Sequence, residues 1–237
     1  MITWLHDFDL SPHDNVQKDK LIFDATCELA SPMVVRVHTF RDYCATTGYL
    51  TRLRGETKEK FKRSAVPLLQ RITGGGVALH GDDLCFSFFF NGGPALNLLY
   101  RSCVMEIRRI VTVILKRSGG IPVKSGNISR FKKRESEFCL GAADEGDIFL
   151  GGEKIAGFAG RVRKNRFLIH LQLITPGWDR DMIRSVAGIQ LNVPGEFSSL
   201  KKFVFSEAFL INMKEEVEYA FSSRMGYCST ISKCLTV

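Results

Sequence analysis

Three consecutive glycines at residues 74–76, in the segment RITGGGVALH, constrain the fold of this chain more than any other part of its sequence. Glycine loses more backbone entropy on folding than other residues do, so a run of three is expected where the backbone takes positive φ angles or approaches another group closely. Adjacent N–H groups in such a turn can bind an anion. The run matches neither the GxxxxGK[ST] phosphate loop nor the GxGxxG dinucleotide fingerprint, and it is also compatible with a tight turn that binds nothing.

Length, charge and cysteine spacing limit the class of protein. The 237 residues are enough for one sizeable hydrophobic core. The formal net charge of +8 is compatible with an acidic partner such as nucleic acid, an anionic membrane or an acidic protein. A basic surface that only keeps the protein in solution is the alternative. The seven cysteines include no CxxC pair, so their spacing suggests neither a metal site nor a disulfide framework.

The chain carries no visible targeting or membrane segment. Met1 is followed by ITWLHDFDL, which is too acidic for a signal peptide, and no apolar run approaches the roughly 18–20 residues of a membrane helix. We therefore expect a cytoplasmic protein with reduced thiols. With no low-complexity linker and no internal repeat, residues 1–237 are expected to form a single domain, without a separate C-terminal accessory domain.

Hydrophobic periodicity predicts a domain of mixed α and β structure. Helices are predicted over residues 13–29, 58–69 (interrupted at Pro67), 94–117, 177–190 and 206–224. In the first of these the apolar positions are Val16, Leu21, Ala25 and Leu29. Strands are predicted over residues 31–40, 43–50, 147–152, 154–160 and 166–174, and VALH and LCFSFFF are predicted to form a β-hairpin across GDD.

A second glycine-rich segment, residues 146–170, places a lysine among small residues. Side chains alternate along a strand, so one face is expected to carry Lys154, Ala156 and Phe158, and the other Ile155, Gly157 and Ala159. The small residues leave room for a ligand against the backbone. A lysine that points into such a pocket is suited to binding a phosphate or a carboxylate.

In this order, RITGGGVALH and GDIFLGGEKIAGFAG resemble the lipoate–protein ligase and octanoyltransferase family, which shares its catalytic fold with biotin–protein ligases. VVRVHTF and CATTGYLTR also match a strand pair of that family, so the resemblance covers about residues 10–175. It implies an α/β (α+β) fold in which a central mixed β-sheet is flanked by helices, like class II synthetases. It also implies that lipoyl or octanoyl is attached to a lysine on the lipoyl domain of a 2-oxoacid dehydrogenase E2 subunit or on the glycine-cleavage H protein.

The resemblance assigns a role to each matching residue. Lys154 would be the catalytic residue at the reacting carbonyl, where a fixed cation stabilises the oxyanion. Arg71 and the glycines would bind the carboxylate and phosphate end of an acyl-adenylate, and Asp147 would hold its adenine or magnesium side. The predicted binding residues are Arg71, Thr73, Gly74, Gly75, Gly76, Val77, His80, Asp147, Ala156, Gly157, Ala159 and His170.

Two activities remain open within this family. The sequence favours a ligase that uses ATP and Mg²⁺ with lipoate as substrate, because the third glycine is intact and the segment after Cys139 lacks the aromatic and glutamate typical of transferases. The alternative is an octanoyltransferase that takes octanoyl from acyl carrier protein through a thioester on Cys139 and needs no cofactor. Gln70 in place of an arginine, Asp83 after the histidine, and the position of Cys139 fifteen residues before Lys154 favour this alternative.

Two further classes fit less of the sequence. A biotin-ligase-type repressor is supported only by the net charge, and residues 1–12 are too short for a helix-turn-helix. We therefore do not expect nucleic acid as a partner. A membrane is not expected as a partner either. A non-catalytic acyl-binding protein of the same fold is the other alternative.

Overall fold

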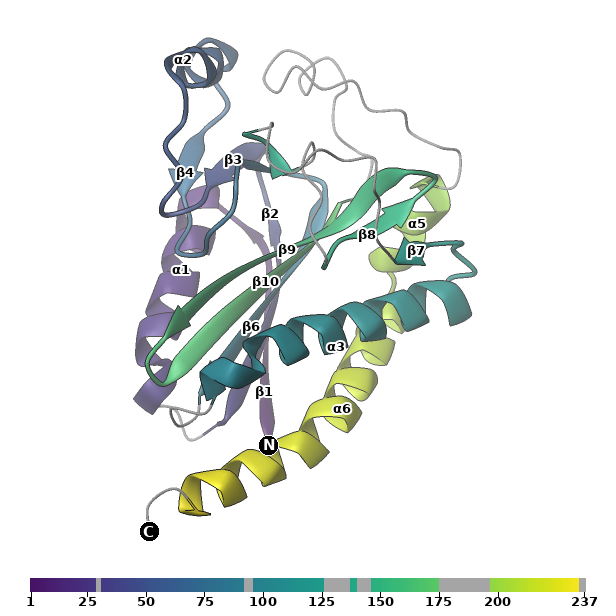
Figure 1. Cartoon of the computed structure of the whole chain (residues 1–237). Helices are drawn as coiled ribbons and strands as arrows, with labels where there is room; N and C mark the ends of the chain where they lie inside the picture. Colours follow the sequence, from purple (N-terminus) through teal and green to yellow (C-terminus); the bar gives the residue numbers. More distant parts are fainter. Residues whose placement is uncertain (29–30, 92–95, 126–136, 140–145, 175–196, 235–237) are drawn as a thin grey trace.

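The computed structural model describes residues 1–28, 31–91, 96–125, 137–139, 146–174 and 197–234 (Figure 1). The helix predicted over 177–190 lies outside these residues. The described part contains two β-sheets with helices around them, which confirms the predicted mixed α/β architecture. No helix in this part of the chain is long and apolar enough to cross a bilayer.

The larger sheet has seven strands in the order β1-β2-β6-β10-β9-β8-β7. Its strands are β1 (Ile2–Leu10), β2 (Met33–Phe40), β6 (Asp83–Asn91), β7 (Lys124–Ser125), β8 (Ile148–Leu150), β9 (Glu153–Arg163) and β10 (Arg166–Ile174). The pair β1 and β2 is parallel and the other pairs are antiparallel, so the sheet is mixed, as predicted. The edge strand β1 was not predicted, because its exposed and half-buried residues follow no regular alternation.

The smaller sheet has three strands, β4 (Leu68–Gln70), β3 (Cys44–Thr47) and β5 (Ala78–His80), in that order. The helices are α1 (Pro12–Ala25), the 3₁₀ helix η1 (Thr26–Glu28), α2 (Gly55–Ser64), α3 (Leu96–Arg117), α5 (Phe197–Val204) and α6 (Glu207–Cys234). Helix α2 ends before Pro67, because Ala65 takes a left-handed conformation with φ of 55°.

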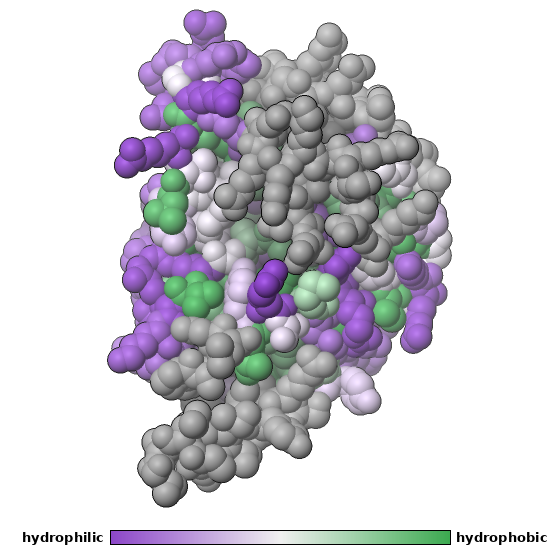
Figure 2. All heavy atoms as spheres, viewed as in Figure 1, coloured by the Kyte–Doolittle hydropathy of each residue, from purple (hydrophilic) through white to green (hydrophobic). Residues whose placement is uncertain are grey.

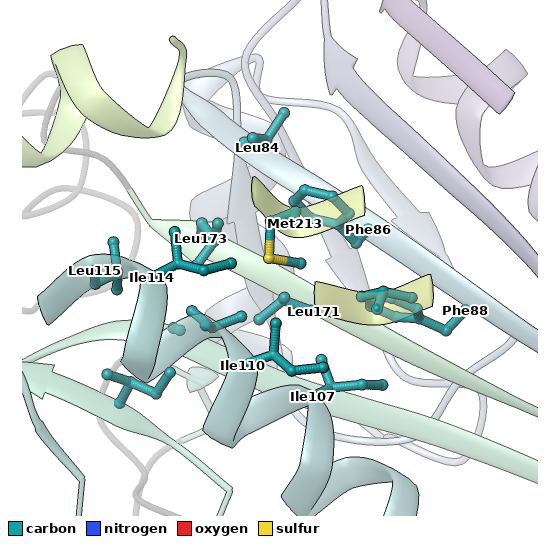
Figure 3. Packing of buried hydrophobic residues seen from close by; sticks show 14 of the residues in the cluster. Leu84, Phe86, Phe88, Ile107, Ile110, Ile114, Leu115, Leu171, Leu173 and Met213 are labelled. Atoms are coloured by element: carbon teal, nitrogen blue, oxygen red, sulfur yellow. The ribbon is translucent and has the colours of Figure 1, made fainter. Parts of the chain in front are cut away.

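The main hydrophobic core lies between the larger sheet and helices α3 and α6 (Figures 1 and 3). Ile107, Val111 and Leu115 form an apolar stripe along α3 and are fully buried. They pack against side chains of β6 and β10 and against Met213 of α6. The core therefore fixes the two central strands of the sheet, and β9 pairs with one of them.

Strand β6 is buried on both faces, which explains the continuous apolar run LCFSFFF. Phe86, Phe88 and Phe90 belong to the main core, whereas Phe89 packs with Phe23 of α1 on the opposite face. A strand covered on both sides lacks the apolar–polar alternation of a half-exposed strand.

Helix α1 turns a partly polar face towards the sheet, so its predicted apolar face is wrong. Its buried residues are Pro12, Asn15, Asp19 and Phe23, whereas Leu21 is 59% exposed. The cause is Arg36 of β2, a fully buried cation whose partners must also be buried.

The Arg36 cluster consists of Arg36, Asp7, Asn15 and Asp19. The guanidinium donates to Asp7 Oδ2 at 2.6 Å, Asp19 Oδ1 at 2.8 Å and Asn15 Oδ1 at 2.5 Å. Burial alone would raise the pKa of Asp19, but the facing groups His170, His38 and Arg36 hold it well below its ordinary value. Paired in this way, the buried charges fasten α1 to β1 and β2.

The predicted hairpin between VALH and LCFSFFF does not form. Strand β5 pairs with β3 in the smaller sheet, and β6 pairs with β2 and β10 in the larger one. The intervening Gly81 has φ of 143° and lies against the ring of Tyr43, so it carries the chain from one sheet to the other. Sequence periodicity detected both strands but contains no information on which strand each would pair with.

We predict that His38 makes the protein less stable below pH 6.5. Burial lowers the pKa of His38 to about 3, although Asp19 opposes the shift, whereas an unfolded histidine titrates near 6.5. Between these values the unfolded chain binds the extra proton, so the free energy of unfolding falls by roughly 1.4 kcal/mol for each pH unit below 6.5. Urea unfolding of wild type and His38→Gln at pH 6.5 and 4.5 should show a smaller decrease in the variant. The exposed His13 provides the control, because His13→Gln should keep the wild-type pH dependence.

Candidate active site

The glycine run forms a loop (residues 74–76) between β4 and β5, and hydrogen bonds from Arg71 hold this loop in place. The Arg71 side chain is buried, and its Nη2 donates to the carbonyl oxygens of Gly74 at 2.7 Å and Gly76 at 3.0 Å. Its Nη1 bonds the carbonyl and hydroxyl oxygens of Thr46, and its Nε bonds Thr73 Oγ1. All five N–H donors of the guanidinium are therefore directed at protein acceptors. The sequence had suggested that Arg71 binds a ligand. In the structure its N–H donors bond the protein, so Arg71 supports the loop instead.

The carbonyl oxygens of the glycine loop point into the protein. In addition to the two Arg71 contacts, Gly75 O accepts from Thr51 Oγ1 at 2.6 Å. The N–H of Gly74 donates to Gly160 O, but those of Gly75 and Gly76 donate to no backbone acceptor among the described residues. Gly75 is exposed and has φ of 92°, as expected for a glycine that presents its amide to a ligand.

Cys139 lies directly beside this loop. The short segment 137–139 pairs with Val77: the Val77 N–H donates to Glu137 O at 2.7 Å, and the Cys139 N–H donates to Val77 O at 2.8 Å. A Cβ on Gly75 would stand 3.9 Å from Cys139 Sγ and 2.9 Å from Arg71 Nη2. The half-buried thiol thus shares one small space with the exposed glycine and the arginine.

Electrostatics distinguishes Cys139 from other cysteines. Of the four cysteines whose side chains are described, Cys44 and Cys85 are buried, and burial raises the pKa of both thiols. Burial lowers the pKa of the Arg71 guanidinium, but interaction with Cys139 opposes this shift. The Arg71 guanidinium and the Cys139 thiol therefore interact directly.

Lys154 reaches the same place from β9. Its Nζ forms an ion pair with the buried Asp147 Oδ2 at 2.7 Å and donates to the carbonyl oxygen of Cys139 at 3.2 Å. Asp147 therefore pairs with the lysine. The sequence had assigned it to a nucleotide or magnesium.

A β-bulge places Lys154 on a different face from the one that strict alternation predicts. Ile148 pairs with Ala156 and Phe149 with Lys154, so Ile155 is an extra residue in β9. A Cβ on Gly157 would lie 2.8 Å from Lys154 Cε, which shows that these two residues share a face. Ala156 is completely buried in the main core, so the predicted wall of the site contains Gly157 and Ala159 but not Ala156.

The two predicted histidines differ in position. His170 Nδ1 lies 3.0 Å from Thr73 Oγ1 and its Nε2 lies 2.9 Å from Asp19 Oδ2, so it braces the glycine loop against the Arg36 cluster. His80 is buried, and both of its nitrogens are engaged, with Thr46 Oγ1 at 2.8 Å and Asp83 Oδ2 at 2.7 Å. His80 therefore stabilises the interior and does not line the site as predicted.

The group His80, Asp83 and Cys85 could in principle bind a metal ion, because its ligand atoms lie within 4.8 Å of one another. However, the Gln172 amide nitrogen donates to the same Asp83 oxygen at 2.7 Å and to the Leu79 carbonyl oxygen at 2.5 Å. An N–H donor directed at the centre of the group is unfavourable for a cation. We interpret the group as a hydrogen-bond network.

Several residues that build the site were not predicted from sequence. Gly48 packs so closely on the glycine loop that a Cβ would overlap the Gly75 carbonyl, and its place in CATTGYL was the available signal. By contrast, Thr73 and Val77 were predicted as binding residues, and both are buried in the structure. Thr46, Thr51 and Glu137 act through contacts between segments that are distant in sequence, which local patterns cannot show.

The site thus combines a loop of the smaller sheet with β9 of the larger one. The family model of the lipoyl protein ligase A/B catalytic domain matches residues 11–209. The chain belongs to this family. The result confirms the resemblance seen in the two glycine-rich motifs.

Curated relatives within the family are octanoyltransferases. LipM of Exiguobacterium sp. is 25% identical over 166 residues, covering 66% of this chain and 60% of the relative. LipM of Staphylococcus aureus is 26% identical over 169 residues, covering 67% and 60%. The match thus spans about 60% of the length of these relatives.

Solved structures with the same fold include proteins in complex with lipoate. A T. acidophilum protein assigned as a lipoate protein ligase, solved with bound lipoic acid, superposes with a TM-score of 0.66 at 20% identity and covers 91% of this chain and 86% of its own. LipL1 of P. falciparum in complex with lipoate gives 0.63 at 14% identity, covering 94% and 63%. These similarities confirm the predicted fold class.

Gly75→Ala should reduce activity more than stability. The new Cβ would require a strained positive φ and would crowd Arg71 Nη2 at the thiol, so we expect a loss of roughly 1–3 kcal/mol in the free energy of unfolding and a larger loss of acyl transfer. Gly152→Ala is the matched control, because Gly152 has φ of 93° and open space around its Cβ. Equal effects of both substitutions on activity would assign the glycine loop a purely conformational role.

Lys154→Ala should abolish acyl transfer and also destabilise the protein. It removes the cation that faces the buried Asp147, and breaking a buried pair in this way costs roughly 3–5 kcal/mol. Adding Asp147→Asn should recover much of the stability, as measured by urea unfolding, without recovering modification of a lipoyl domain, as measured by mass. Activity in the double variant would show that Lys154 is only structural.

Proposed function

We propose that this chain is an acyltransferase that moves an octanoyl group from acyl carrier protein to a lysine of a lipoyl domain through a thioester on Cys139. The observation that carries the proposal is the position of Cys139 between the glycine loop, Arg71 and Lys154. The names of the octanoyltransferase relatives support it. The enzyme would act as one catalytic domain in the cytoplasm, on E2 subunits or the H protein.

In the first step the Cys139 thiolate attacks the thioester carbonyl of the donor. A new C–S bond forms to Cys139, the C–S bond to the carrier breaks, and the released carrier thiolate takes up a proton. A thioester exchanged for a thioester needs neither ATP nor a metal ion. Arg71 stabilises the attacking thiolate by its charge.

In the second step the lysine amine of the lipoyl domain attacks the acyl-enzyme. The C–N bond forms, the C–S bond to Cys139 breaks, and the amine loses its proton as the thiolate is restored. Both steps pass through a tetrahedral oxyanion. We assign its stabilisation to the Lys154 ammonium, which lies at the Cys139 backbone, and to the N–H groups of Gly75 and Gly76, which donate to no backbone acceptor among the described residues.

The ligase interpretation from the sequence remains a prediction, but this geometry favours it less. It requires charges for the phosphates of ATP and for Mg²⁺. Arg71 directs all its donors at the protein, and Asp147 is paired with Lys154, so neither residue is arranged to bind them. The intact third glycine, which favoured a ligase, has a local explanation, because a Cβ on Gly76 would overlap the Glu137 carbonyl oxygen.

Cys139→Ser distinguishes the two activities. Mixing wild type with octanoyl-acyl carrier protein should give an octanoyl adduct on the enzyme by mass, and the variant should give none and transfer roughly 100-fold less octanoyl to an apo lipoyl domain. Cys103→Ser is the matched control, because Cys103 is also half-buried but lies on α3, and it should behave like wild type. A parallel reaction with lipoate, ATP and Mg²⁺ completes the test. Modification there by both wild type and Cys139→Ser, with no adduct from the carrier protein, would establish the ligase instead.

A further inference from the structure

Helix α2 is attached to the rest of the protein by few contacts of its own. Its outer surface is hydrophilic (Figure 2), and only Thr57 and Phe61 of the helix are buried. The residue that precedes its first turn, Arg54, makes no side-chain capping hydrogen bond. The first N–H groups of a helix have no partner within it, so this end needs acceptors from elsewhere.

Glu137 supplies acceptors at this end of the helix from eighty or more residues further along the chain. Its Oε1 accepts from the Arg54 N–H at 2.7 Å, and its Oε2 accepts from the Thr57 hydroxyl group. The arrangement reproduces a capping box, in which a glutamate bonds the N–H of the capping residue, but the glutamate comes from outside the helix. A negative charge at a helix N-terminus is also electrostatically favourable.

The same three-residue segment carries the candidate nucleophile. Phe138 stacks on Phe61 of α2 with ring centroids 6.2 Å apart, inside a small apolar cluster. Cys139 is fixed through its N–H to Val77 O. Glu137 therefore binds α2 by hydrogen bonds, Phe138 binds it by apolar packing, and Cys139 carries the thiol.

The segment 137–139 lies in close contact with the glycine loop. The Glu137 carbonyl oxygen accepts from Val77 N at 2.7 Å and occupies the position of the missing Gly76 Cβ. A small displacement of Glu137 would therefore move the backbone that carries Cys139 relative to Gly75 and Arg71.

We propose that Glu137 is a positioning residue, whose carboxylate clamps the N-terminus of α2 and so holds the Cys139 thiol against the glycine loop and Arg71. Its catalytic consequence rests on the proposed function, whereas its structural consequence does not. Misplacement of a reacting group by about 1 Å can reduce a rate by roughly 100-fold, so the clamp should affect turnover more than binding.

Two measurements on Glu137→Ala test the proposal. Hydrogen–deuterium exchange, which needs no substrate, should show faster exchange of the Val77 and Cys139 amides by roughly tenfold or more, with the core strands unchanged. With octanoyl-acyl carrier protein as donor, kcat should fall roughly tenfold or more while KM changes by less than about twofold. Glu137→Gln, which keeps one acceptor oxygen, should recover part of both effects. Glu56→Ala removes an exposed carboxylate from the same turn and should change neither.

A second substitution separates positioning from simple helix stability. Arg54→Asn gives α2 a capping side chain of its own, so Glu137→Ala with Arg54→Asn should recover thermal stability but not kcat. Full recovery of kcat in this double variant, or unchanged amide exchange in Glu137→Ala, would overturn the proposal. If wild type forms no octanoyl adduct, the proposed function fails, but the exchange measurement still decides whether the clamp exists.

Discussion

The candidate active site depends on one buried guanidinium. Arg71 directs five N–H groups at oxygens of Thr46, Thr73 and the glycine loop, and this fixes the carbonyl groups of Gly74 and Gly76. A lysine could not replace it, because a single ammonium cannot bond both Gly74 and Gly76 while also holding Thr46 and Thr73. Since each unpaired buried donor costs roughly 1–3 kcal/mol, the loop has no comparably stable alternative conformation around this arginine.

The chemical groups of the site come from two sheets that meet at the glycine loop. Hydrogen bonds from Gly74 N to Gly160 O, from Arg161 Nη1 to Ile72 O and from Gln172 Nε2 to Leu79 O join them. Lys154 comes from β9 of the larger sheet, and Asp147 directly precedes β8, whereas the glycine loop connects two strands of the smaller sheet. The segment that bears Cys139 pairs with Val77 next to this loop. The distance between the Cys139 thiol and the Lys154 ammonium therefore depends on how the two sheets contact each other.

The sequence predicted those parts of the fold and site that depend on local pattern. The long helix α3 follows from hydrophobic periodicity. The family resemblance of the two glycine-rich motifs implied that the glycine run and Lys154 serve one site, with Cys139 as its nucleophile in the transferase alternative. The predictions failed where the structure depends on a single residue or on a partner that is distant in the sequence. The extra residue in β9 reversed the face assigned to Lys154 and removed Ala156 from the site, and the buried Arg36 made the interior face of α1 polar. The bonds between Glu137 and α2 span eighty residues or more, and no local pattern indicates them.

The Arg36 cluster restricts how this sequence can change over evolutionary time. Replacing one member leaves the others buried with uncompensated charge, at a cost of roughly 3–5 kcal/mol, which is a large part of the stability of an ordinary domain. Replacing the whole set by apolar residues of similar volume can be close to neutral. Single substitutions at positions 7, 19 and 36 should therefore be rare in descendants of this chain. An apolar interior beneath α1 would be reached only when these three positions and Asn15 change together.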